Sequence, residues 1–329
     1  MRAAVAYEAG EPDQLRLVEL PIPSVQEGEV LIKVRAFGLN RSELMTRKGL
    51  SPDVEFPRIL GIECVGEVEE DPSGQYNKGQ KVAAFMGGMG RSFDGSYAEF
   101  TVLPKSVITP FVSSLPWEIL GALPEMFQTT YGSLHLALKV NPGETLLIRG
   151  GTSSIGMLAA QLAKTAGLKV VSTTRNPKKK DFLLKHGVDK VLIDDGKLAE
   201  QIQSDPNLQI DKVLELVGTS TLKDSLRCVK AGGSLCMTGM LAEEWSIPEF
   251  APMEFIPATV NLTIYDTGQV RVEGKYFQDF ITDIEKKLIS PIIKRVFSLE
   301  EIVDAHSFME SNSGGGKIVV LTNSNNHSQ

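Results

Sequence analysis

The stretch Leu146-Leu147-Ile148-Arg149-Gly150-Gly151-Thr152-Ser153-Ser154-Ile155-Gly156 joins a short apolar run to a glycine-containing turn. Apolar residues then recur at the spacing of one helix face, at Ile155, Leu158, Ala159, Leu162 and Ala163. A buried strand that turns through glycines into an amphipathic helix is the context in which such a turn binds a nucleotide. The stretch therefore predicts a strand–helix unit with phosphate at the helix N-terminus.

The turn departs from the G-x-G-x-x-G template at one position. Gly151 would make the tight turn and Gly156 would let helix and strand pack closely, but Ser153 stands where backbone approaches the pyrophosphate. The predicted cofactor-binding residues of the turn are Gly151, Ser153, Ser154, Ile155 and Gly156. A plain strand-to-helix turn without a ligand is the alternative.

Four more strand-like segments follow, at residues 169–174, 191–193, 213–217 and 234–237, with helical segments between them. Strands that alternate with helices imply parallel βαβ units with right-handed crossovers. We therefore expect an α/β fold with a doubly wound parallel sheet in this part of the chain.

The end of the second strand bears on the choice between NAD and NADP. An acidic residue about 20 positions beyond the glycine turn would hydrogen-bond the adenine ribose of NAD. Thr174 and Arg175 stand there instead, and no acid occurs before Asp181. The hydroxyl of Thr174 and the cations of Arg175 and Lys179 favour a 2′-phosphate, and hence NADPH. The alternative is a solvated, charged helix start.

Residues 1 to about 120 contain short strand-like runs, such as 30–34 and 97–102, that glycines and prolines separate. This pattern is typical of a small all-β barrel or sandwich. Near the C-terminus, a helix with one apolar face is expected over 277–288 and a strand over 318–321. His306, four residues after Ile302, is expected to be packed rather than catalytic.

The chain has 329 residues, with 34 Lys and Arg against 41 Asp and Glu, a net charge of −7 and three cysteines. The length favours two domains, and the acidic balance disfavours a nucleic-acid or anionic-membrane partner. Three scattered cysteines and no signal-peptide pattern favour a reducing, cytoplasmic location. Acidic pairs such as Asp194-Asp195 are typical of solvated faces.

Several short motifs are spread along the chain: Gly61-Ile62-Glu63-Cys64-Val65-Gly66-Glu67-Val68, Gly95-Ser96-Tyr97-Ala98-Glu99 and Gly316-Lys317-Ile318-Val319. They resemble the G-H-E-x-x-G-x-V, G-x-Y-A-E and G-K-I-V motifs of the medium-chain dehydrogenase/reductase superfamily. The resemblance implies a GroES-like β-barrel catalytic domain at 1–122 and 266–329, split around a Rossmann NADPH-binding domain at 123–265.

Two positions separate the branches of that superfamily. In its alcohol dehydrogenase branch the His of G-H-E and an upstream Cys coordinate the catalytic zinc, whereas Ile62 and Asn40 stand in those places here. Neither is a normal zinc ligand, so no metal site is expected and alcohol oxidation would lack its Lewis acid. Residues 38–49 and 124–131 resemble instead the zinc-free quinone oxidoreductase branch.

The resemblance also implies where the nicotinamide would lie. Thr129 of the helix motif would approach it. The residues that would border it follow the fourth and fifth strands and are Val217, Gly218, Gly239 and Met240.

Three polar side chains are predicted to donate hydrogen bonds to a substrate carbonyl oxygen, namely Asn40, Thr129 and Tyr97. Asn40 is equally compatible with a turn role, in which it holds its own backbone. Met45 occupies a position where many members of the branch have Tyr, so no proton donor is assigned.

Three functions are compatible with these residues. The first is an NADPH-dependent quinone oxidoreductase, because a quinone needs orientation and water exclusion more than activation. The second is NADPH-dependent reduction of an activated C=C bond in an enone, alkenal or enoyl thioester. The third is a non-catalytic nucleotide-binding or RNA-binding role. Relatives commonly form homodimers through Rossmann sheet edges, and residues 260–265 are the candidate edge strand.

Overall fold

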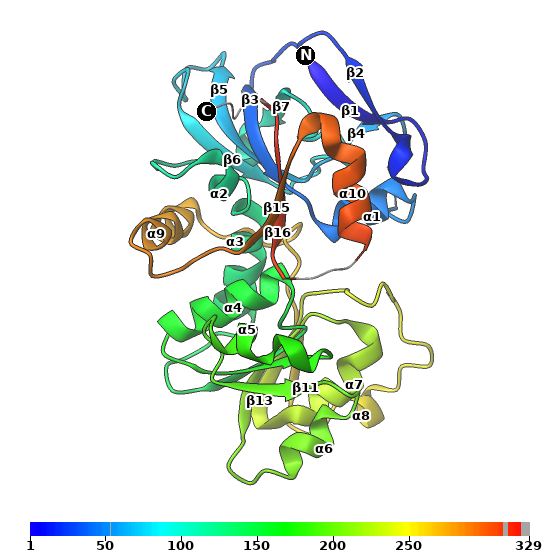
Figure 1. Cartoon of the computed structure of the whole chain (residues 1–329), viewed down its shortest axis with the longest axis vertical. Helices are drawn as coiled ribbons and strands as arrows, with labels where there is room; N and C mark the ends of the chain where they lie inside the picture. The colour runs from blue at the N-terminus through cyan, green and yellow to red at the C-terminus, as the bar shows by residue number, and fades with distance from the viewer. Residues whose placement is uncertain (53, 312–314, 324–329) are drawn as a thin grey trace. The chain divides into compact units, whose positions relative to one another are not determined.

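The computed structural model describes residues 1–52, 54–311 and 315–323, which divide into two compact units (Figure 1). Unit 1 comprises Met1–Glu125 and Glu273–Gln329, and unit 2 comprises Met126–Val272. The sequence places the boundaries earlier, at 122/123 and 265/266. The first unit is thus split around the second, as expected, but each junction lies further along the chain.

Gln128 explains the position of the second junction. Its side-chain Nε2 donates to Tyr265 Oη at 3.0 Å and to the Val270 carbonyl oxygen at 2.9 Å, and its Oε1 accepts from the Val272 amide at 3.1 Å. The segment after the last strand of unit 2 is therefore bound to the helix that opens this unit. These side-chain contacts leave no periodic signal in the sequence.

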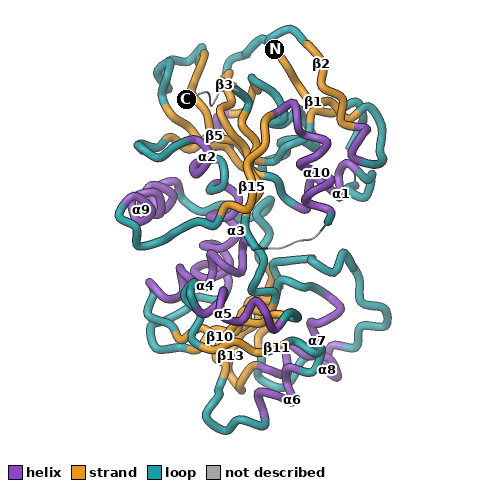
Figure 2. Tube along the Cα trace, in the orientation of Figure 1, coloured by secondary structure: helices purple, strands orange, loops and turns teal. Residues whose placement is uncertain are grey.

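Unit 2 is built on a six-stranded, all-parallel sheet in the order β11-β10-β9-β12-β13-β14 (Figure 2). Its strands are β9 (Thr145–Arg149), β10 (Lys169–Thr174), β11 (Lys190–Ile193), β12 (Ile210–Glu215), β13 (Val229–Met237) and β14 (Asn261–Ile264). The chain winds outward from β9 to β11 and then returns to the other side of β9 with β12. This is the doubly wound sheet that the sequence predicts, and its predicted edge strand is β14.

The helices of unit 2 connect these strands, and the central strands are buried on both faces, as their apolar runs require. They are α3 (Pro124–Tyr131), the π-helix η3 (Gly132–Ala137), α4 (Ser154–Thr165), η4 (Pro177–Lys179), α5 (Lys180–Leu184), α6 (Leu198–Gln203), α7 (Thr219–Cys228) and α8 (Pro252–Phe255). Helix α3 starts at the end of unit 1, and the rest of it belongs to unit 2.

Unit 1 contains a seven-stranded sheet, ordered β15-β16-β3-β5-β6-β8 with β7 also paired to β3, and a three-stranded sheet, ordered β2-β1-β4. Its strands are β1 (Arg2–Ala6), β2 (Leu15–Glu19), β3 (Glu29–Gly38), β4 (Arg58–Ile59), β5 (Glu63–Glu70), β6 (Lys81–Phe85), β7 (Phe100–Pro104), β8 (Ile108–Pro110), β15 (Ile293–Ser298) and β16 (Lys317–Leu321). The Ala4 amide donates to the Tyr97 carbonyl oxygen at 2.7 Å, and the Glu99 amide donates to that of Arg2 at 3.0 Å. These bonds join the two sheets into one β-domain.

Short helices complete unit 1, namely α1 (Arg41–Arg47), α2 (Trp117–Leu120), α9 (Gly274–Glu285), α10 (Ile302–Glu310), η1 (Pro12–Gln14), η2 (Lys105–Val107) and η5 (Leu299–Glu301). Helix α9 buries the predicted apolar face through Phe277, Phe280, Ile281 and Ile284, whereas Leu288 lies beyond its end and is exposed. In the part of the chain that the structure describes, none of the helices combines the length and apolarity needed to cross a membrane.

His306 of α10 is fully buried in the core of unit 1. Its Nε2 lies 2.9 Å from Tyr97 Oη, and the ring of Tyr97 stacks on Phe37 with centroids 4.7 Å apart. Burial and the nearby Arg47 guanidinium lower the pKa of His306 from 6.5 to about 3. The histidine is therefore a packing residue, as the sequence predicts, and is neutral at physiological pH.

Because His306 is buried and neutral, we predict that the free energy of unfolding decreases at acidic pH. Its pKa is lower in the folded than in the unfolded chain, so its contribution is present above pH 6.5 and is lost as the pH falls toward 3. Between pH 7 and pH 4.5 wild type should lose about 2 kcal/mol more unfolding free energy than His306→Gln, which cannot titrate. Urea titrations at both pH values measure this difference, and equal losses would contradict a neutral buried histidine.

Candidate functional site

The carboxyl ends of β9 and β12 mark the place where the sheet of unit 2 reverses its winding. In open α/β sheets, ligands bind in the crevice beside such a switch point. The turns that follow these two strands are close, because a Cβ added to Gly150 would lie 3.1 Å from Leu216 Cβ and 3.6 Å from Val217 Cγ2. Gly150 also has a φ of +91°, a conformation that side-chain-bearing residues rarely adopt.

The glycine turn after β9 has no room for side chains at two positions. A Cβ on Gly151 would lie 1.8 Å from Ser172 Oγ, and one on Gly156 would lie 2.7 Å from the Gly150 carbonyl oxygen. Gly151 therefore lets the turn pass over β10, and Gly156 lets α4 start directly against the turn. Gly156 therefore allows the close packing of helix and turn that the sequence pattern suggests. The reason at Gly151 differs from the predicted one: it is the approach to Ser172, and the positive φ of the turn belongs to Gly150.

Ser153, which replaces the middle glycine of the template, is the N-cap of α4. Its Oγ accepts from the Gly156 amide at 3.0 Å and donates to the Gly150 carbonyl oxygen at 2.8 Å. The hydroxyl is thus committed to holding the turn. The cap leaves the amides of Ser154 and Ile155 at the open end of a 12-residue helix, where the helix dipole favours an anion.

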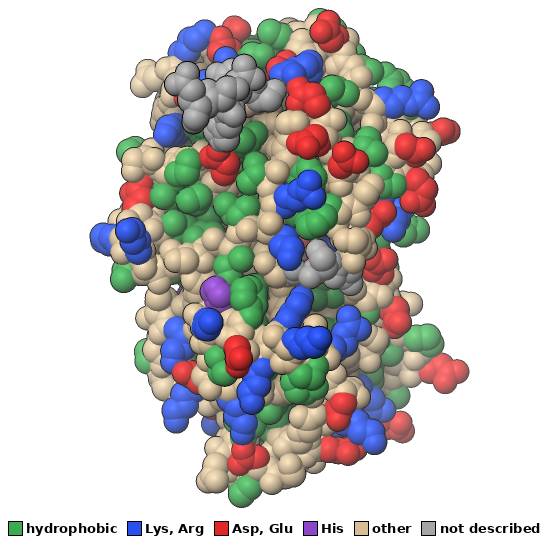
Figure 3. All heavy atoms as spheres, in the orientation of Figure 1, with side chains coloured by type: hydrophobic (Ala, Val, Ile, Leu, Met, Phe, Trp, Pro, Cys, Tyr) green, Lys and Arg blue, Asp and Glu red, His purple; other side chains and the backbone are tan. Residues whose placement is uncertain are grey.

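The predicted 2′-phosphate residues follow β10, but they differ in exposure. Thr174 is buried, and its Oγ1 accepts from the Asn176 amide at 3.1 Å. Lys179 is half-buried, whereas Arg175 is exposed and, within the described residues, forms no ion pair. Figure 3 shows several Lys and Arg side chains on the face of unit 2 that carries α5. Of the two predicted cations, Arg175 is therefore the more exposed.

The four residues expected to border the nicotinamide come together at the ends of β12 and β13. The amides of Val217 and Gly218 both donate to Glu215 Oε1, at 2.7 and 3.1 Å. A Cβ on Gly218, whose φ is +115°, would lie 3.4 Å from the Gly239 carbonyl oxygen and from Met240 Cα. The structure thus places these residues in two adjoining loops.

Thr129 lies one helical turn before the π-helix η3. Ser133 Oγ donates to the Thr129 carbonyl oxygen at 2.6 Å and lies 2.8 Å from Thr238 Oγ1. The turn that carries Thr129 is therefore tied to the end of β13, beside Gly239. A π-turn at this point was not predicted, although such turns are frequent at functional sites.

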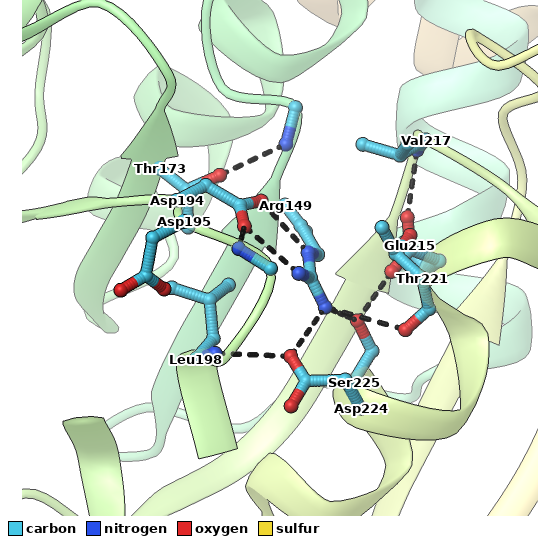
Figure 4. A network of polar contacts seen from close by, with 12 residues as sticks. Arg149, Thr173, Asp194, Asp195, Leu198, Glu215, Val217, Thr221, Asp224 and Ser225 are labelled. Atoms are coloured by element: carbon cyan, nitrogen blue, oxygen red, sulfur yellow. Dashed lines mark hydrogen bonds and ion pairs between the residues drawn. The ribbon is translucent and has the colours of Figure 1, made fainter. Parts of the chain in front are cut away.

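Arg149 is a polar centre that the sequence analysis did not single out. Its side chain is fully buried at the end of β9, and it forms ion pairs with Asp194 and Asp224 (Figure 4). The prediction that the Asp194-Asp195 pair is a solvated face is therefore wrong for Asp194, whose side chain is 9% exposed. The available signal was a charge that ends an apolar strand, because a buried charge requires a partner.

Asn40 belongs to a buried polar cluster in unit 1, together with Glu43, Glu63 and Lys317. Asn40 Nδ2 donates to Glu63 Oε1 at 2.9 Å, and Asn40 Oδ1 accepts from Lys317 Nζ at 2.5 Å. Lys317 Nζ also lies 2.7 Å from Glu63 Oε1. Asn40 is the N-cap of α1 as well, in a capping box with Glu43. The turn role that the sequence left open is thus present.

Burial dominates the electrostatics of this cluster. It raises the pKa of Glu43 to about 7, and the charge of Glu63 adds to the increase, whereas Lys317 opposes it. Gly38 makes room for the cluster, because a Cβ there would lie 2.3 Å from Lys317 Cε and 2.5 Å from Glu63 Oε1. Two carboxyl groups and one ammonium group therefore lie together in a site where each of the three residues is at most 2% exposed.

Ile62 and Tyr97, the other unit 1 residues on which the predictions depend, are both buried. The hydroxyl of Tyr97 is already engaged by His306, so the geometry favours a packing role for Tyr97 over a contact with substrate. Among the described residues, no group of three or more His, Cys, Asp or Glu side chains could hold a metal ion.

Two family models match the chain in the order of its domains. The alcohol dehydrogenase GroES-like domain matches residues 26–113, and the zinc-binding dehydrogenase model matches residues 154–283. The chain belongs to the medium-chain dehydrogenase/reductase superfamily. Unit 1 carries the GroES-like domain of this oxidoreductase, and unit 2 carries its Rossmann domain.

Curated relatives of this medium-chain dehydrogenase/reductase align over almost its full length. A zinc-type alcohol dehydrogenase-like protein of Schizosaccharomyces pombe is 27% identical and covers 97% of this chain and 99% of its own. The quinone oxidoreductase of Mus musculus is 27% identical and covers 98% of both chains. The acryloyl-coenzyme A reductase of Metallosphaera sedula is 24% identical and covers 98% of this chain and 100% of its own.

Solved structures resemble the whole chain. A mycobacterial protein complexed with NADPH has a TM-score of 0.85 and 25% identity, covering 98% of this chain and 100% of its own. The Escherichia coli quinone oxidoreductase complexed with NADPH has a TM-score of 0.87 and 20% identity, with the same coverage. At 20% identity, the similarity to the Escherichia coli protein shows a shared fold and nothing more.

The contact between Gly151 and Ser172 predicts a pair of compensating substitutions. Gly151→Ala should lower the unfolding free energy by about 1–3 kcal/mol, because its Cβ overlaps Ser172 Oγ. Adding Ser172→Ala removes that oxygen and leaves the Thr173 carbonyl oxygen at 3.0 Å and the residue 172 Cβ at 3.1 Å, so the double variant should recover about half of the loss. Urea denaturation measures both, and an undiminished Gly151→Ala variant would contradict the close approach.

Proposed function

We propose that this protein is an NADPH-dependent quinone oxidoreductase whose hydride transfer requires no metal ion. The observation that carries the proposal is the polar cluster of unit 1. At the two places where alcohol dehydrogenases of this superfamily hold zinc, the chain has the buried apolar side chain of Ile62 and an amide oxygen of Asn40 that accepts from Lys317. The positive charge in this cluster comes from the ammonium group of Lys317.

The nucleotide part of the proposal rests on unit 2. Its switch point, the glycine turn and the open amides of Ser154 and Ile155 fit a dinucleotide. Arg175 supplies an exposed guanidinium where an acid would favour NAD. The mycobacterial neighbour, which is 25% identical, is complexed with NADPH, and this supports the same cofactor here.

The bound nicotinamide would supply the hydride, and the side chains of this protein would orient the acceptor. Asn40 is half-buried and carries an amide that donates in its cluster, and Thr129 carries a hydroxyl on α3. We assign Thr129 to a hydrogen bond with a substrate carbonyl oxygen. Asn40 Nδ2 already donates to Glu63 Oε1 at 2.9 Å and to Glu43 Oε1 at 3.3 Å, so the geometry favours the turn role for Asn40. A quinone is already electrophilic, so orientation and exclusion of water are the main requirements. The mouse relative named quinone oxidoreductase supports this substrate class.

A second candidate is the reduction of an activated C=C bond. The acryloyl-coenzyme A reductase of Metallosphaera sedula covers the chain at 24% identity and favours this alternative. Such a reaction also requires a proton at carbon, and Met45, buried in α1, offers none. We therefore rank it second, and a non-catalytic nucleotide- or RNA-binding role third.

The homodimer remains a proposal that β14 supports. This strand ends the sheet of unit 2, so its outer backbone groups are not paired within the described sheet. An edge of this kind can pair with the same strand of a second copy.

The role of Arg175 predicts a selective loss of affinity. Arg175→Ala should weaken NADPH binding about tenfold or more, because a guanidinium–phosphate pair is lost, and should change NADH binding less than twofold. Titrations that follow nicotinamide fluorescence measure both constants. Lys169→Ala is the matched control, since it removes the same charge from the opposite end of β10. Parallel losses for the two nucleotides would remove Arg175 from the phosphate site.

The activity itself is tested with NADPH and a panel of quinones, enones, alkenals and enoyl thioesters. We expect turnover with quinones to be fastest and to persist after dialysis against a strong zinc chelator. Loss of turnover that zinc restores would overturn the metal-free reaction. Faster reduction of enones or thioesters would select the second candidate, and binding without any turnover would select the third.

A further inference from the structure

We propose that Arg149 is a specificity-determining residue for the nucleotide. It holds the carboxylate of Asp194 inward, so that the ribose end of the site stays open to a 2′-phosphate. This inference rests on the NADPH preference proposed above. It adds the buried Arg149 to the exposed Arg175 as a residue that determines this preference.

Asp194 lies beside the predicted phosphate-binding segment. It directly follows β11, whose last residue, Ile193, is the register partner of Thr174 at the end of β10. The Asp194 amide donates to the Thr174 carbonyl oxygen at 3.0 Å. A carboxylate is therefore built next to Thr174 and Arg175, although the end of β10 itself carries no acid.

An acid at the end of the second Rossmann strand, here β10, normally accepts from the ribose hydroxyl of NAD. Asp194 stands at the end of the adjoining strand β11, where an unneutralised carboxylate would repel a 2′-phosphate by its charge. Here both oxygens of Asp194 are occupied. Its Oδ2 accepts from Arg149 Nε and its Oδ1 from Arg149 Nη2, each at 2.8 Å, and Oδ1 also accepts from the Gly196 amide at 3.0 Å. This two-point geometry fixes the direction of the carboxylate as well as neutralising it.

Arg149 cannot follow Asp194 outward, because α7 anchors the other side of its guanidinium. Arg149 Nη1 lies 2.8 Å from Asp224 Oδ2, 3.0 Å from Ser225 Oγ and 3.2 Å from the Thr221 carbonyl oxygen. Burial would lower the pKa of Arg149, but its acidic neighbours raise it above its usual value, so the group stays charged. Figure 4 shows the guanidinium between Asp194 and Asp224.

The remaining acids of this region are held by other groups. Glu215 accepts from Ser225 Oγ and from the amides of Val217 and Gly218. Asp195 points away from Arg149 in Figure 4, and its Oδ1 accepts from the Lys197 amide at 3.0 Å and from Gln201 Nε2 at 2.9 Å. Asp195 is thus an acid of the same loop that Arg149 does not bind, and it provides a matched control.

The experiment compares dissociation constants for NADPH and NADH by nicotinamide fluorescence, without turnover. In Arg149→Met the freed carboxylate should reduce the ratio of NADH to NADPH constants about tenfold, the size expected of one unit charge acting on a phosphate across several ångströms of solvent. Arg149→Met/Asp194→Asn should return the ratio to within about twofold of wild type. Asp195→Asn should leave it unchanged.

If Arg149→Met does not fold, Arg149→Lys and Arg149→Lys/Asp194→Asn form the same comparison, since lysine keeps the charge and loses the two-point geometry. Equal ratios in the single and double variants, or parallel changes in both constants, would overturn the proposal and leave Arg149 a purely structural role. A wild type without NADPH preference would instead refute the proposed cofactor, and the single-to-double comparison would still show whether Arg149 restrains Asp194.

Discussion

The ion pairs of Arg149 hold together three segments that the chain reaches one after another: the end of β9, the loop after β11 and helix α7. The glycine turn starts at the next residue, so its position depends on this buried guanidinium. Removing one partner of such a pair typically costs about 3–5 kcal/mol, because the other charge is left buried. Two features therefore fix the carboxyl end of β9: the buried ion pairs of Arg149, and the glycines of the turn that follows.

Unit 1 applies the same principle with a different cation. Lys317 compensates Glu63 directly and shares Asn40 with it, and Glu43 closes the cluster through the backbone of Asn40 and Ile62. In both units, a polar group that could face a ligand is held by ionic neighbours with little or no exposed surface. The buried cations thus determine which oxygen atoms can still contact a ligand: Arg149 binds both oxygens of Asp194, and Lys317 binds Glu63 Oε1 and Asn40 Oδ1.

Local patterns predicted the parts of the fold that local physics determines. The alternation of strands and helices in unit 2, the glycine turn and the edge strand β14 all follow from period, turn chemistry and apolar runs. The position of the second junction depends instead on the amide of Gln128, and the inward orientation of Asp194 on a guanidinium 45 residues earlier. Tyr97 belongs to a readable motif, yet its engagement by His306 spans 209 residues. Contacts at such separations have no signature in composition or spacing.

The split of unit 1 affects how the protein folds during synthesis. A ribosome releases all of unit 2 before it makes β15 and β16, and domains fold as units during synthesis. Strand β3 can pair with β16, through Val319 and Gly38, only after β16 has been synthesised. Pairings between segments so far apart in the sequence form slowly. Until Lys317 is synthesised, Glu63 lacks the ammonium group that lies 2.7 Å from its Oε1 in the folded protein. Closure of unit 1 therefore depends on β16, the last strand among the described residues. A chain cut before β16 lacks both the strand that pairs with the end of β3 and the ammonium group that pairs with Glu63.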